Sequence, residues 1–439
     1  MVEQAPSSSL AERERLFRKV RRRLIPFLVV CYFVAYIDRV NVGFAALGMN
    51  KDLGFTPLVY GWGAGIFFLG YFVFEVPSNV ILDRLGARLW IARIMLTWGV
   101  ISMCMALVRG ASSFYVLRFL LGVAEAGFFP GMLLYLTYWF PADQRAKVVG
   151  LFMLANPIST VIGAPLSGAL LGIEGFLGLK GWQWLFIIEG IPSLLLGLSV
   201  YFYLTDRPAH ARWLAPEDRQ TLERIMEDDR SRRQIQHRSW AQGLSNPRVL
   251  ALGLIYFGAC ASNYGLSFWL PQIVKTFGVT NFQTGLIAAL PYACGAAAMV
   301  FWGAHSDRTG ERTGHVAFPL VLTSVCILVS SQIANPYWKM FLLCIAGLGI
   351  FAVLPPFWTL PTGLMTGAAA AASIALVNSI GNLSGFVAPY MIGWIKNSTD
   401  SYGLALAALA ALPLIAMVAV LVLQHRTHPS TPNVAVPSP

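Results

Sequence analysis

Charged side chains are scarce in this sequence. Asp, Glu, Lys and Arg make up 12% of its 439 residues, whereas soluble globular domains contain about 25%, and dense stretches of charge occur only at residues 10–23 and 205–238. Hydrophobic residues account for 56%, and the mean hydropathy is +0.62. This composition excludes a water-soluble globular enzyme and a disordered chain.

The sequence also has no basic surface of the kind that binds nucleic acid. Its net charge is +11, but the basic residues occupy short interruptions between apolar blocks instead of one solvated face. We therefore expect no nucleic-acid partner. The excess of basic residues indicates membrane topology.

Cysteine and histidine form no metal-binding or disulfide pattern. The six cysteines each lie inside an apolar block, without a C-x-x-C motif or a His–Cys cluster. No G-x-S-x-G elbow or Walker loop stands at an interfacial position. We therefore expect no metal, no cofactor and no enzymatic activity.

The sequence does contain long apolar blocks. A helix needs about 20 apolar residues to cross the hydrocarbon core, and these blocks are too long for barrel strands, the other structure that satisfies its backbone in lipid. We expect an all-α integral membrane protein with twelve transmembrane helices. The predicted spans are 24–47, 58–81, 88–108, 112–138, 144–170, 182–204, 248–271, 284–304, 315–334, 337–357, 363–394 and 402–424.

Lys and Arg are distributed unequally between the two sides of these spans. With the N-terminus inside, 24 of the 32 fall on the cytoplasmic side, 6 on the other side and 2 within the membrane. Positive charge favours the cytoplasmic side, so we expect both termini to be cytoplasmic. The predicted organisation is a basic N-terminus (1–23), a six-helix half (24–204), a cytoplasmic linker (205–247), a second six-helix half (248–424) and a disordered Pro/Ser-rich tail (425–439).

The two predicted halves resemble each other at a fixed offset of 224 residues. The segment from Asn79 to Arg88 recurs from Gly303 to Arg312 with its Asp, Arg, Gly and Arg in place, and the same offset relates Tyr32 to Tyr256. It also relates Gly61 to Gly285 and Pro165 to Pro389. Two six-helix halves related by such a repeat are typical of secondary transporters, which bind their substrate between the halves.

These motifs resemble those of the major facilitator superfamily, whose signature G-x-x-x-D-R-x-G-x-R follows the second and eighth spans. The second copy matches it fully, and the first has Asn79 in place of the leading glycine. Further strings look like the anion:cation symporter family, and within it the chain is most similar to bacterial tartrate-type transporters. These strings are Tyr36–Ala45, Phe74–Asn79, Arg118–Gly131 and Gly181–Gly190.

Four charged residues lie inside the predicted spans of the first half. Asp38 and Arg39 lie just past the middle of the first span, and Arg118 and Glu125 lie two turns apart on one face of the fourth. An ionisable side chain at the bilayer centre costs about 3 kcal/mol or more, so such residues usually pair and mark a transport pathway. The positions equivalent to 38 and 39 in the second half carry Ser and Asn, which places the coupling chemistry in the first half.

We predict that Asp38 and Glu125 couple to protons and that Arg39 and Arg118 bind the substrate. Proton uptake by a carboxylate would free a guanidinium, which binds a carboxylate as a bidentate fork. Two forks favour a compact dicarboxylate. Similarity to the symporter family implies the same roles for these residues. The alternative is a pair of static salt bridges, Asp38–Arg39 and Arg118–Glu125.

Uncharged residues complete the predicted site. The hydroxyls of Tyr36 and Tyr71 can bind a polyol or a carboxylate. Resemblance to sugar-acid symporters implies that Asn156, Trp358 and Asn378 line the substrate cavity.

Other buried or loop groups are expected to be structural. We expect Glu75 and Glu189 to be helix caps or rim contacts, and His305 and His315 to be solvated, so no histidine proton relay is predicted. We expect the linker helix around residues 216–227 to be a solvated tether. The charges of the two repeated motifs are expected to form a cytoplasmic gate, made of Asp83, Arg84, Arg88, Asp307, Arg308 and Arg312.

The predicted function is proton-coupled import of a small organic anion, tartrate or a sugar acid, across a bacterial inner membrane, by a monomer whose partners are this anion, protons and the lipid bilayer. An aromatic acid such as phthalate or 4-hydroxyphenylacetate is the alternative substrate. A less favoured alternative is efflux by antiport, because Ala164 interrupts the Gly-Pro pair that is associated with antiporters. A transporter-like receptor would carry the same charges without accumulating a substrate.

Overall fold

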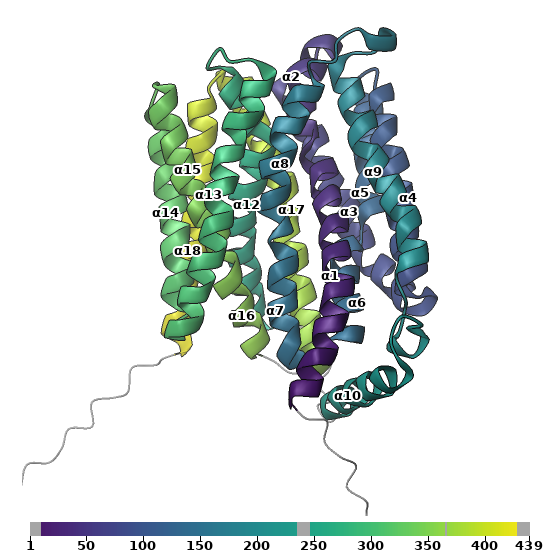
Figure 1. The fold of residues 1–439 in the computed structure, drawn as a ribbon. Helices are drawn as coiled ribbons and strands as arrows, with labels where there is room; N and C mark the ends of the chain where they lie inside the picture. Colours follow the sequence, from purple (N-terminus) through teal and green to yellow (C-terminus); the bar gives the residue numbers. More distant parts are fainter. Residues whose placement is uncertain (1–9, 235–245, 365–366, 428–439) are drawn as a thin grey trace, which may run out of the picture.

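The computed structural model describes residues 10–234, 246–364 and 367–427, and the regular structure in these residues is helical (Figure 1). Residues 428–439 of the predicted tail and parts of the predicted N-terminus and linker lie outside the described residues, whereas residues 425–427, which we expected to be disordered, continue the last helix. The α-helices are α1 (Leu10–Val40), α2 (Val42–Leu53), α3 (Pro57–Leu85), α4 (Ala87–Cys104), α5 (Ala111–Glu125), α6 (Phe128–Trp139), α7 (Ala142–Met153), α8 (Ala155–Leu170), α9 (Gly181–Tyr203), α10 (Pro216–Gln234), α12 (Pro247–Lys275), α13 (Asn281–Thr309), α14 (Thr313–Gln332), α15 (Pro336–Ala352), α16 (Leu354–Leu364), α17 (Gly367–Thr399) and α18 (Tyr402–Thr427).

The all-α membrane fold predicted from the apolar blocks is confirmed. Among the described residues, eleven helical segments have the length and composition to cross a membrane, and they coincide with eleven of the twelve predicted spans. The twelfth prediction, 363–394, corresponds to α17, which runs beside the others (Figure 1). Residues 365–366 of this predicted span lie outside the described residues.

The fourth predicted span is broken near its middle at Gly127, between α5 and α6. Gly127 has φ 83°, and a Cβ atom there would lie 2.4 Å from Ser78 Oγ, so the break requires glycine. The first, fifth and tenth spans continue through Asn41, Leu154 and Val353, which keep right-handed helical φ and ψ where α1 meets α2, α7 meets α8 and α15 meets α16. A discontinuous helix such as the fourth span is typical of transporter binding sites.

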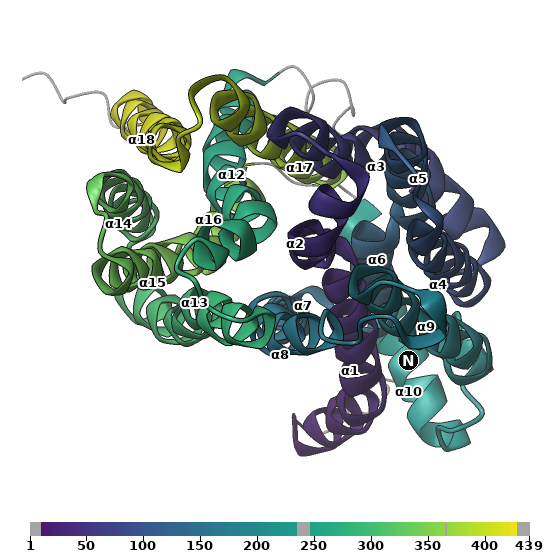
Figure 2. The ribbon, with the colours of Figure 1, turned by 90° about the horizontal axis from the view of Figure 1, so that it is seen from above.

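Two groups of helices face each other when the molecule is viewed along the helix axes (Figure 2). We call residues 10–204 the N-terminal half and residues 246–427 the C-terminal half. They meet through three helix pairs: α3 with α17, α8 with α13, and α2 with α12. Glycines permit the close approach, because a Cβ atom at Gly61 would lie 2.6 Å from the carbonyl of Pro389, and one at Gly285 would lie 2.3 Å from that of Ala164. These contacts lie toward the end of the molecule where α3 and α13 begin, which we call the glycine end.

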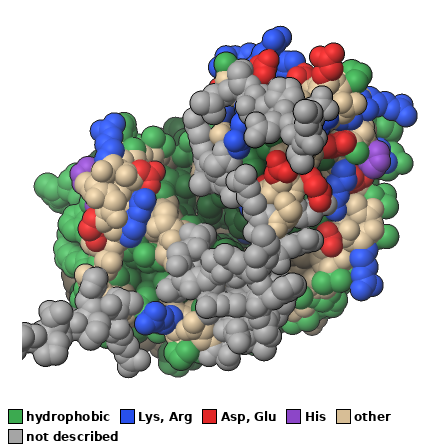
Figure 3. Space-filling model, turned by 90° about the horizontal axis from the view of Figure 1, so that it is seen from below, with side chains coloured by type: hydrophobic (Ala, Val, Ile, Leu, Met, Phe, Trp, Pro, Cys, Tyr) green, Lys and Arg blue, Asp and Glu red, His purple; other side chains and the backbone are tan. Residues whose placement is uncertain are grey.

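The other end of the molecule carries α10, and we call it the α10 end. Contrary to the prediction of a solvated tether, α10 packs on the N-terminal half: Leu222 and Met226 are buried, and Asp218 accepts a hydrogen bond from Lys19 of α1 at 2.5 Å. Seen from the α10 end, charged side chains surround a hollow between the halves that shows hydrophobic side chains (Figure 3).

Candidate functional site

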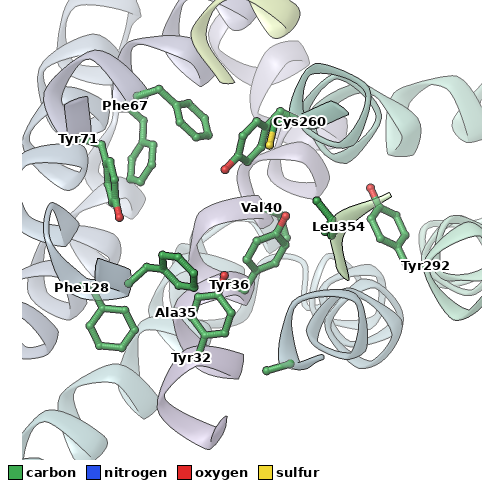
Figure 4. Close-up of a cluster of buried hydrophobic side chains, with 14 of the residues drawn as sticks. Tyr32, Ala35, Tyr36, Val40, Phe67, Tyr71, Phe128, Cys260, Tyr292 and Leu354 are labelled. Carbon is green, nitrogen blue, oxygen red and sulfur yellow. The ribbon is translucent and has the colours of Figure 1, made fainter. Parts of the chain in front are cut away.

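A central cavity lies between the two halves and is lined by residues of both. Figure 4 shows part of its wall, where Tyr36 of α1, Cys260 of α12 and Leu354 of α16 come together from both halves. The span break at Gly127 lies two residues from the cavity residue Phe129. The described residues that line the cavity are Tyr32, Tyr36, Arg39, Tyr71, Phe129, Met153, Asn156, Tyr256, Ala259, Cys260, Asn263, Tyr264, Ile350, Leu354, Asn378 and Asn382.

Arg39 is the only Lys or Arg among the described residues that line this cavity. Its guanidinium forms an ion pair with Glu125, whose Oε1 accepts hydrogen bonds from Nη2 and, at 3.0 Å, from Nε. The two side chains are 6% and 2% exposed. The ring of Tyr71 lies 5.3 Å from the guanidinium carbon. The cavity therefore contains one cation, which is already paired with a buried carboxylate.

Asp38 faces away from this cavity. It is 1% exposed, and its carboxylate accepts hydrogen bonds from Trp98 Nε1 at 2.9 Å, from Ser102 Oγ at 3.1 Å and from Ser193 Oγ. These donors belong to α4 and α9, so Asp38 lies between helices of one half. The alternative of a static salt bridge between Asp38 and Arg39 is therefore wrong.

Arg118 is also not a cavity residue. Its guanidinium is fully buried and donates to the main-chain carbonyls of Gly63 at 3.2 Å and Ala64 at 3.0 Å. The expected ion pair between Arg118 and Glu125 is therefore replaced by the pair of Arg39 with Glu125. In this conformation Arg118 holds α5 against α3 and is not available to a substrate.

Of the five uncharged residues predicted to form the site, four line the cavity and one does not. Tyr36, Tyr71, Asn156 and Asn378 line the cavity. Trp358 lies outside the lining, where its ring packs on that of Tyr256 with centroids 4.9 Å apart.

Two amide oxygens at the cavity have no hydrogen-bond partner in the described structure. They are Asn156 Oδ1 and Asn263 Oδ1, and both are buried. The Nδ2 atom of Asn263 donates to the hydroxyl of Tyr36 at 2.8 Å. Buried polar groups are normally hydrogen-bonded, so these oxygens are candidate acceptors for donors of a ligand.

Two carboxylates that we expected to be caps or rim contacts are buried inside the molecule. Glu75 is 4% exposed and accepts hydrogen bonds from Asn378 and Ser379 of α17. Glu189 is 3% exposed and accepts one from Ser167 at 2.6 Å. The expectation is therefore wrong for both, and Glu75 joins the two halves.

The predicted gate residues lie at the α10 end, at the ends of α3 and α13. Asp83 accepts a hydrogen bond from the Tyr138 hydroxyl at 2.7 Å, and Arg312 donates to Asp307 at 2.8 Å. Asp206 accepts the main-chain N–H of Arg88 at 2.8 Å. Arg84 and Arg308 are exposed. Among the described residues, no hydrogen bond or ion pair links the gate residues of one half to those of the other.

The expectation that His315 is solvated is wrong, whereas His305 is exposed. His315 is 7% exposed, and its Nε2 lies 2.8 Å from His305 Nδ1. Its Nδ1 lies 2.7 Å from the carboxylate of Glu311. Although partial burial opposes it, hydrogen bonds from the main-chain N–H of Gly314 and from His315 hold the pKa of Glu311 below its ordinary value of 4.5.

Several cavity residues were not predicted as site residues. Two pairs of cavity residues are related by the 224-residue offset: Tyr32 with Tyr256, and Arg39 with Asn263. The repeat therefore contained a usable signal for Tyr256 and Asn263, because equivalent positions on equivalent helices face the same central space. Tyr264 and Asn382 carried no comparable signal.

Comparisons with known proteins agree with this architecture. The model of the "Major Facilitator Superfamily" matches residues 28–389 and 252–436. A protein of Agrobacterium vitis named "Putative tartrate transporter" is 51% identical, with 96% of this chain and 98% of that protein covered. A "Quinolone resistance transporter" of Acinetobacter baumannii is 45% identical, with 89% of this chain and 91% of that protein covered.

Among solved structures, a bacterial homologue of the human lysosomal transporter Spinster, in an inward-facing and occupied conformation, superposes with a TM-score of 0.76. It is 16% identical and covers 93% of this chain and 97% of its own, so the likeness concerns the fold. Eleven apolar spans, paired helices across a central cavity and the family match over most of the chain lead to one conclusion: this multi-pass membrane protein is a transporter and not an enzyme, and it belongs to the major facilitator superfamily.

Proposed function

We propose that this protein imports a hydroxylated dicarboxylate such as tartrate together with protons. The observation that carries the proposal is the Arg39–Glu125 pair, because one cation in the cavity has one carboxylate partner that can be neutralised by a proton. Similarity to the relative named for tartrate supports the substrate class.

The coupling step exchanges the partner of Arg39. When Glu125 takes up a proton, its attraction for the guanidinium falls, and Arg39 can form a bidentate pair with a substrate carboxylate. An Arg39 left without either anion would be a buried unpaired charge, which is costly. Proton and substrate therefore bind together, which is the requirement for symport. Because Arg118 and Asp38 lie off the cavity, this step uses only one of the two predicted arginine forks and one of the two predicted proton carriers.

The amide oxygens at the cavity support a substrate with hydroxyl groups. In the orientation of this structure Asn156 Oδ1 and Asn263 Oδ1 accept hydrogen bonds, and a carboxylate, which has no donor, could bind these amides only after they reversed. A hydroxyl supplies the missing donor. This favours tartrate or a sugar acid over phthalate, which has no hydroxyl group.

Alternating access follows from the two ends of the interface. The halves are in close backbone contact at the glycine end, whereas the gate residues of the two halves are not linked at the α10 end. We assign the α10 end to the cytoplasm of a bacterial inner membrane, because the cytoplasmic side is rich in Lys and Arg. The structure then corresponds to a state open or opening inward, and the gate charges would join the halves when the cavity faces outward. Opening the glycine end would require these close contacts to separate.

An uptake screen in proteoliposomes tests the proposal. The purified protein is reconstituted, and accumulation of labelled organic acids is measured with and without an imposed pH gradient, acid outside. We expect accumulation of tartrate only with the gradient, and exchange of substrate without it. A sodium requirement that is independent of pH would refute proton symport.

Efflux of an aromatic compound is the second candidate. Aromatic residues that line the cavity favour flat ligands, and a 45% identical relative is named for quinolone resistance. They are Tyr32, Tyr36, Tyr71, Phe129, Tyr256 and Tyr264. Competition by quinolones or phthalate but not by tartrate in the same screen would support this candidate.

A further inference from the structure

Glu75 is a buried carboxylate that the coupling step does not use. It lies one turn from the cavity residue Tyr71 on α3, and no ion pair reaches it among the described residues. Its Oε1 accepts a hydrogen bond from Asn378 Nδ2 at 2.8 Å, and its Oε2 accepts one from Ser379 Oγ at 3.2 Å. Both donors belong to α17, so these bonds cross from the N-terminal half to the C-terminal half.

The Glu75 carboxylate determines how the amide of Asn378 is turned. An amide has donors on nitrogen and acceptors on oxygen, whereas an ionised carboxylate only accepts. A reversed Asn378 amide would place its oxygen against a carboxylate oxygen and would leave a buried acceptor without a donor, which is costly. The Nδ2 atom of Asn378 is therefore held toward Glu75.

The oxygen of Asn378 is then the atom that the amide presents to the cavity. Asn378 is 7% exposed and lines the cavity, and within the described residues no hydrogen bond reaches its Oδ1 atom. The site at this point is a hydrogen-bond acceptor of fixed polarity.

Two other cavity asparagines have partners that do not fix their polarity. Asn263 donates to the hydroxyl of Tyr36 at 2.8 Å, and Asn382 accepts from the hydroxyl of Tyr264 at 2.9 Å. A hydroxyl can both donate and accept, so either amide can reverse without losing its bond. Among these three hydrogen-bonded amides, only that of Asn378 is bonded to a carboxyl group, which cannot donate while it is ionised.

We propose that Glu75 is a specificity-determining positioning residue, which locks the Asn378 amide so that the cavity accepts a hydroxyl and rejects a carbonyl at this position. The inference rests on the proposed function, because it takes the substrate to be an organic acid bound beside Asn378. Glu75 acts through Asn378 and does not itself touch the substrate.

The substitution Glu75→Gln tests this role. A glutamine can donate or accept toward Asn378, so both orientations of the amide become available at similar energy. Uptake of labelled tartrate by proteoliposomes is competed by unlabelled tartrate and by the acid in which one hydroxyl carbon of tartrate is a ketone. We expect the wild type to prefer tartrate by at least about tenfold, and Glu75→Gln to reduce the preference to within about threefold.

The matched control is Ser379→Ala. It removes the bond to the other carboxylate oxygen while leaving the Asn378 bond in place, and Ser379 does not belong to the described cavity lining. We expect its preference for tartrate to equal that of the wild type, even if its uptake rate falls. A loss of preference in Ser379→Ala as large as that in Glu75→Gln would overturn the proposal.

The proposal would also be overturned if Glu75→Gln kept the wild-type preference for tartrate while uptake of both acids fell equally. Glu75 would then only hold α3 against α17. Failure of the proposed function has a different signature. The wild type itself would transport no organic acid, and both proposals would fall together.

Discussion

Replacing Glu125 by Gln should separate substrate binding from proton coupling. In the wild type the substrate competes with Glu125 for Arg39, and one proton must bind for each anion that takes its place. Apparent affinity should then fall by about tenfold for each pH unit above the pH at which Glu125 releases its proton. The amide of the variant is neutral at every pH, so this slope should disappear.

The size of the effect follows from burial of the pair. Breaking a buried ion pair by removing one partner costs about 3–5 kcal/mol, and the Arg39 and Glu125 side chains are 6% and 2% exposed. Because Arg39 borders the cavity, where water can reach it, we take the lower value. A substrate carboxylate recovers that energy in Glu125→Gln, so its affinity at high pH should rise on the order of a hundredfold.

Binding of tartrate to the purified protein at several pH values, with counterflow and gradient-driven uptake in proteoliposomes, measures all three consequences. We expect pH-independent binding, retained counterflow and no accumulation. The exposed Glu217 of α10 supplies the control, because Glu217→Gln removes one carboxylate far from the cavity and should behave as the wild type. A pH slope that survives in Glu125→Gln would show that another group carries the proton.

Three further substitutions test the packing around the site. Arg118→Lys should lower the melting temperature in detergent by several degrees, because a lysine cannot satisfy two carbonyls of α3 as a guanidinium does. It should change the affinity for tartrate less than threefold. A sharp loss of affinity at normal stability would show that Arg118 binds the substrate. Gly285→Ala should abolish uptake but leave a folded protein, because its Cβ would lie 2.3 Å from the Ala164 carbonyl and prevent closure of the glycine end. The control Gly150→Ala, at a position with open space around it, should transport normally. Glu311→Gln should lower the melting temperature near neutral pH, and the difference in melting temperature from the wild type should shrink as pH falls below 4.5. The reason is that a carboxyl whose pKa is depressed on folding loses its stabilising effect when it is protonated. A difference that is constant down to pH 3 would contradict the assigned hydrogen bonds.

The spans could be predicted from the sequence because their signal is local. A run of about 20 apolar residues is its own evidence for a transmembrane helix, and eleven runs reappear as such helices in the described residues. The sidedness, the domain bounds and the roles of the site residues remain predictions.

The partners of the buried charges could not be predicted in the same way. Adjacent residues of a helix point in different directions, about 100° apart, so Asp38 and Arg39 face different neighbours although they are consecutive. Arg39 meets a carboxylate 86 positions away. Which charges meet depends on the rotation and packing of whole helices, and this information is not contained in the spacing of charges along one span.

The 224-residue repeat shows which features of the halves must be alike and which must differ. Gly61 packs on Pro389 and Gly285 packs near Pro165, so the residues related by the repeat close the same end of the interface from opposite sides. A symmetric closure of this kind gives the halves a common axis about which to rock. The chemistry at the repeated positions is different, because Arg39 carries a charge where Asn263 carries an amide. If both halves had an arginine and an acid at this level, two exchanging ion pairs would compete for one substrate, and each could open without the other. A single exchangeable pair in one half, with neutral amides opposite, links the proton to the substrate through one event.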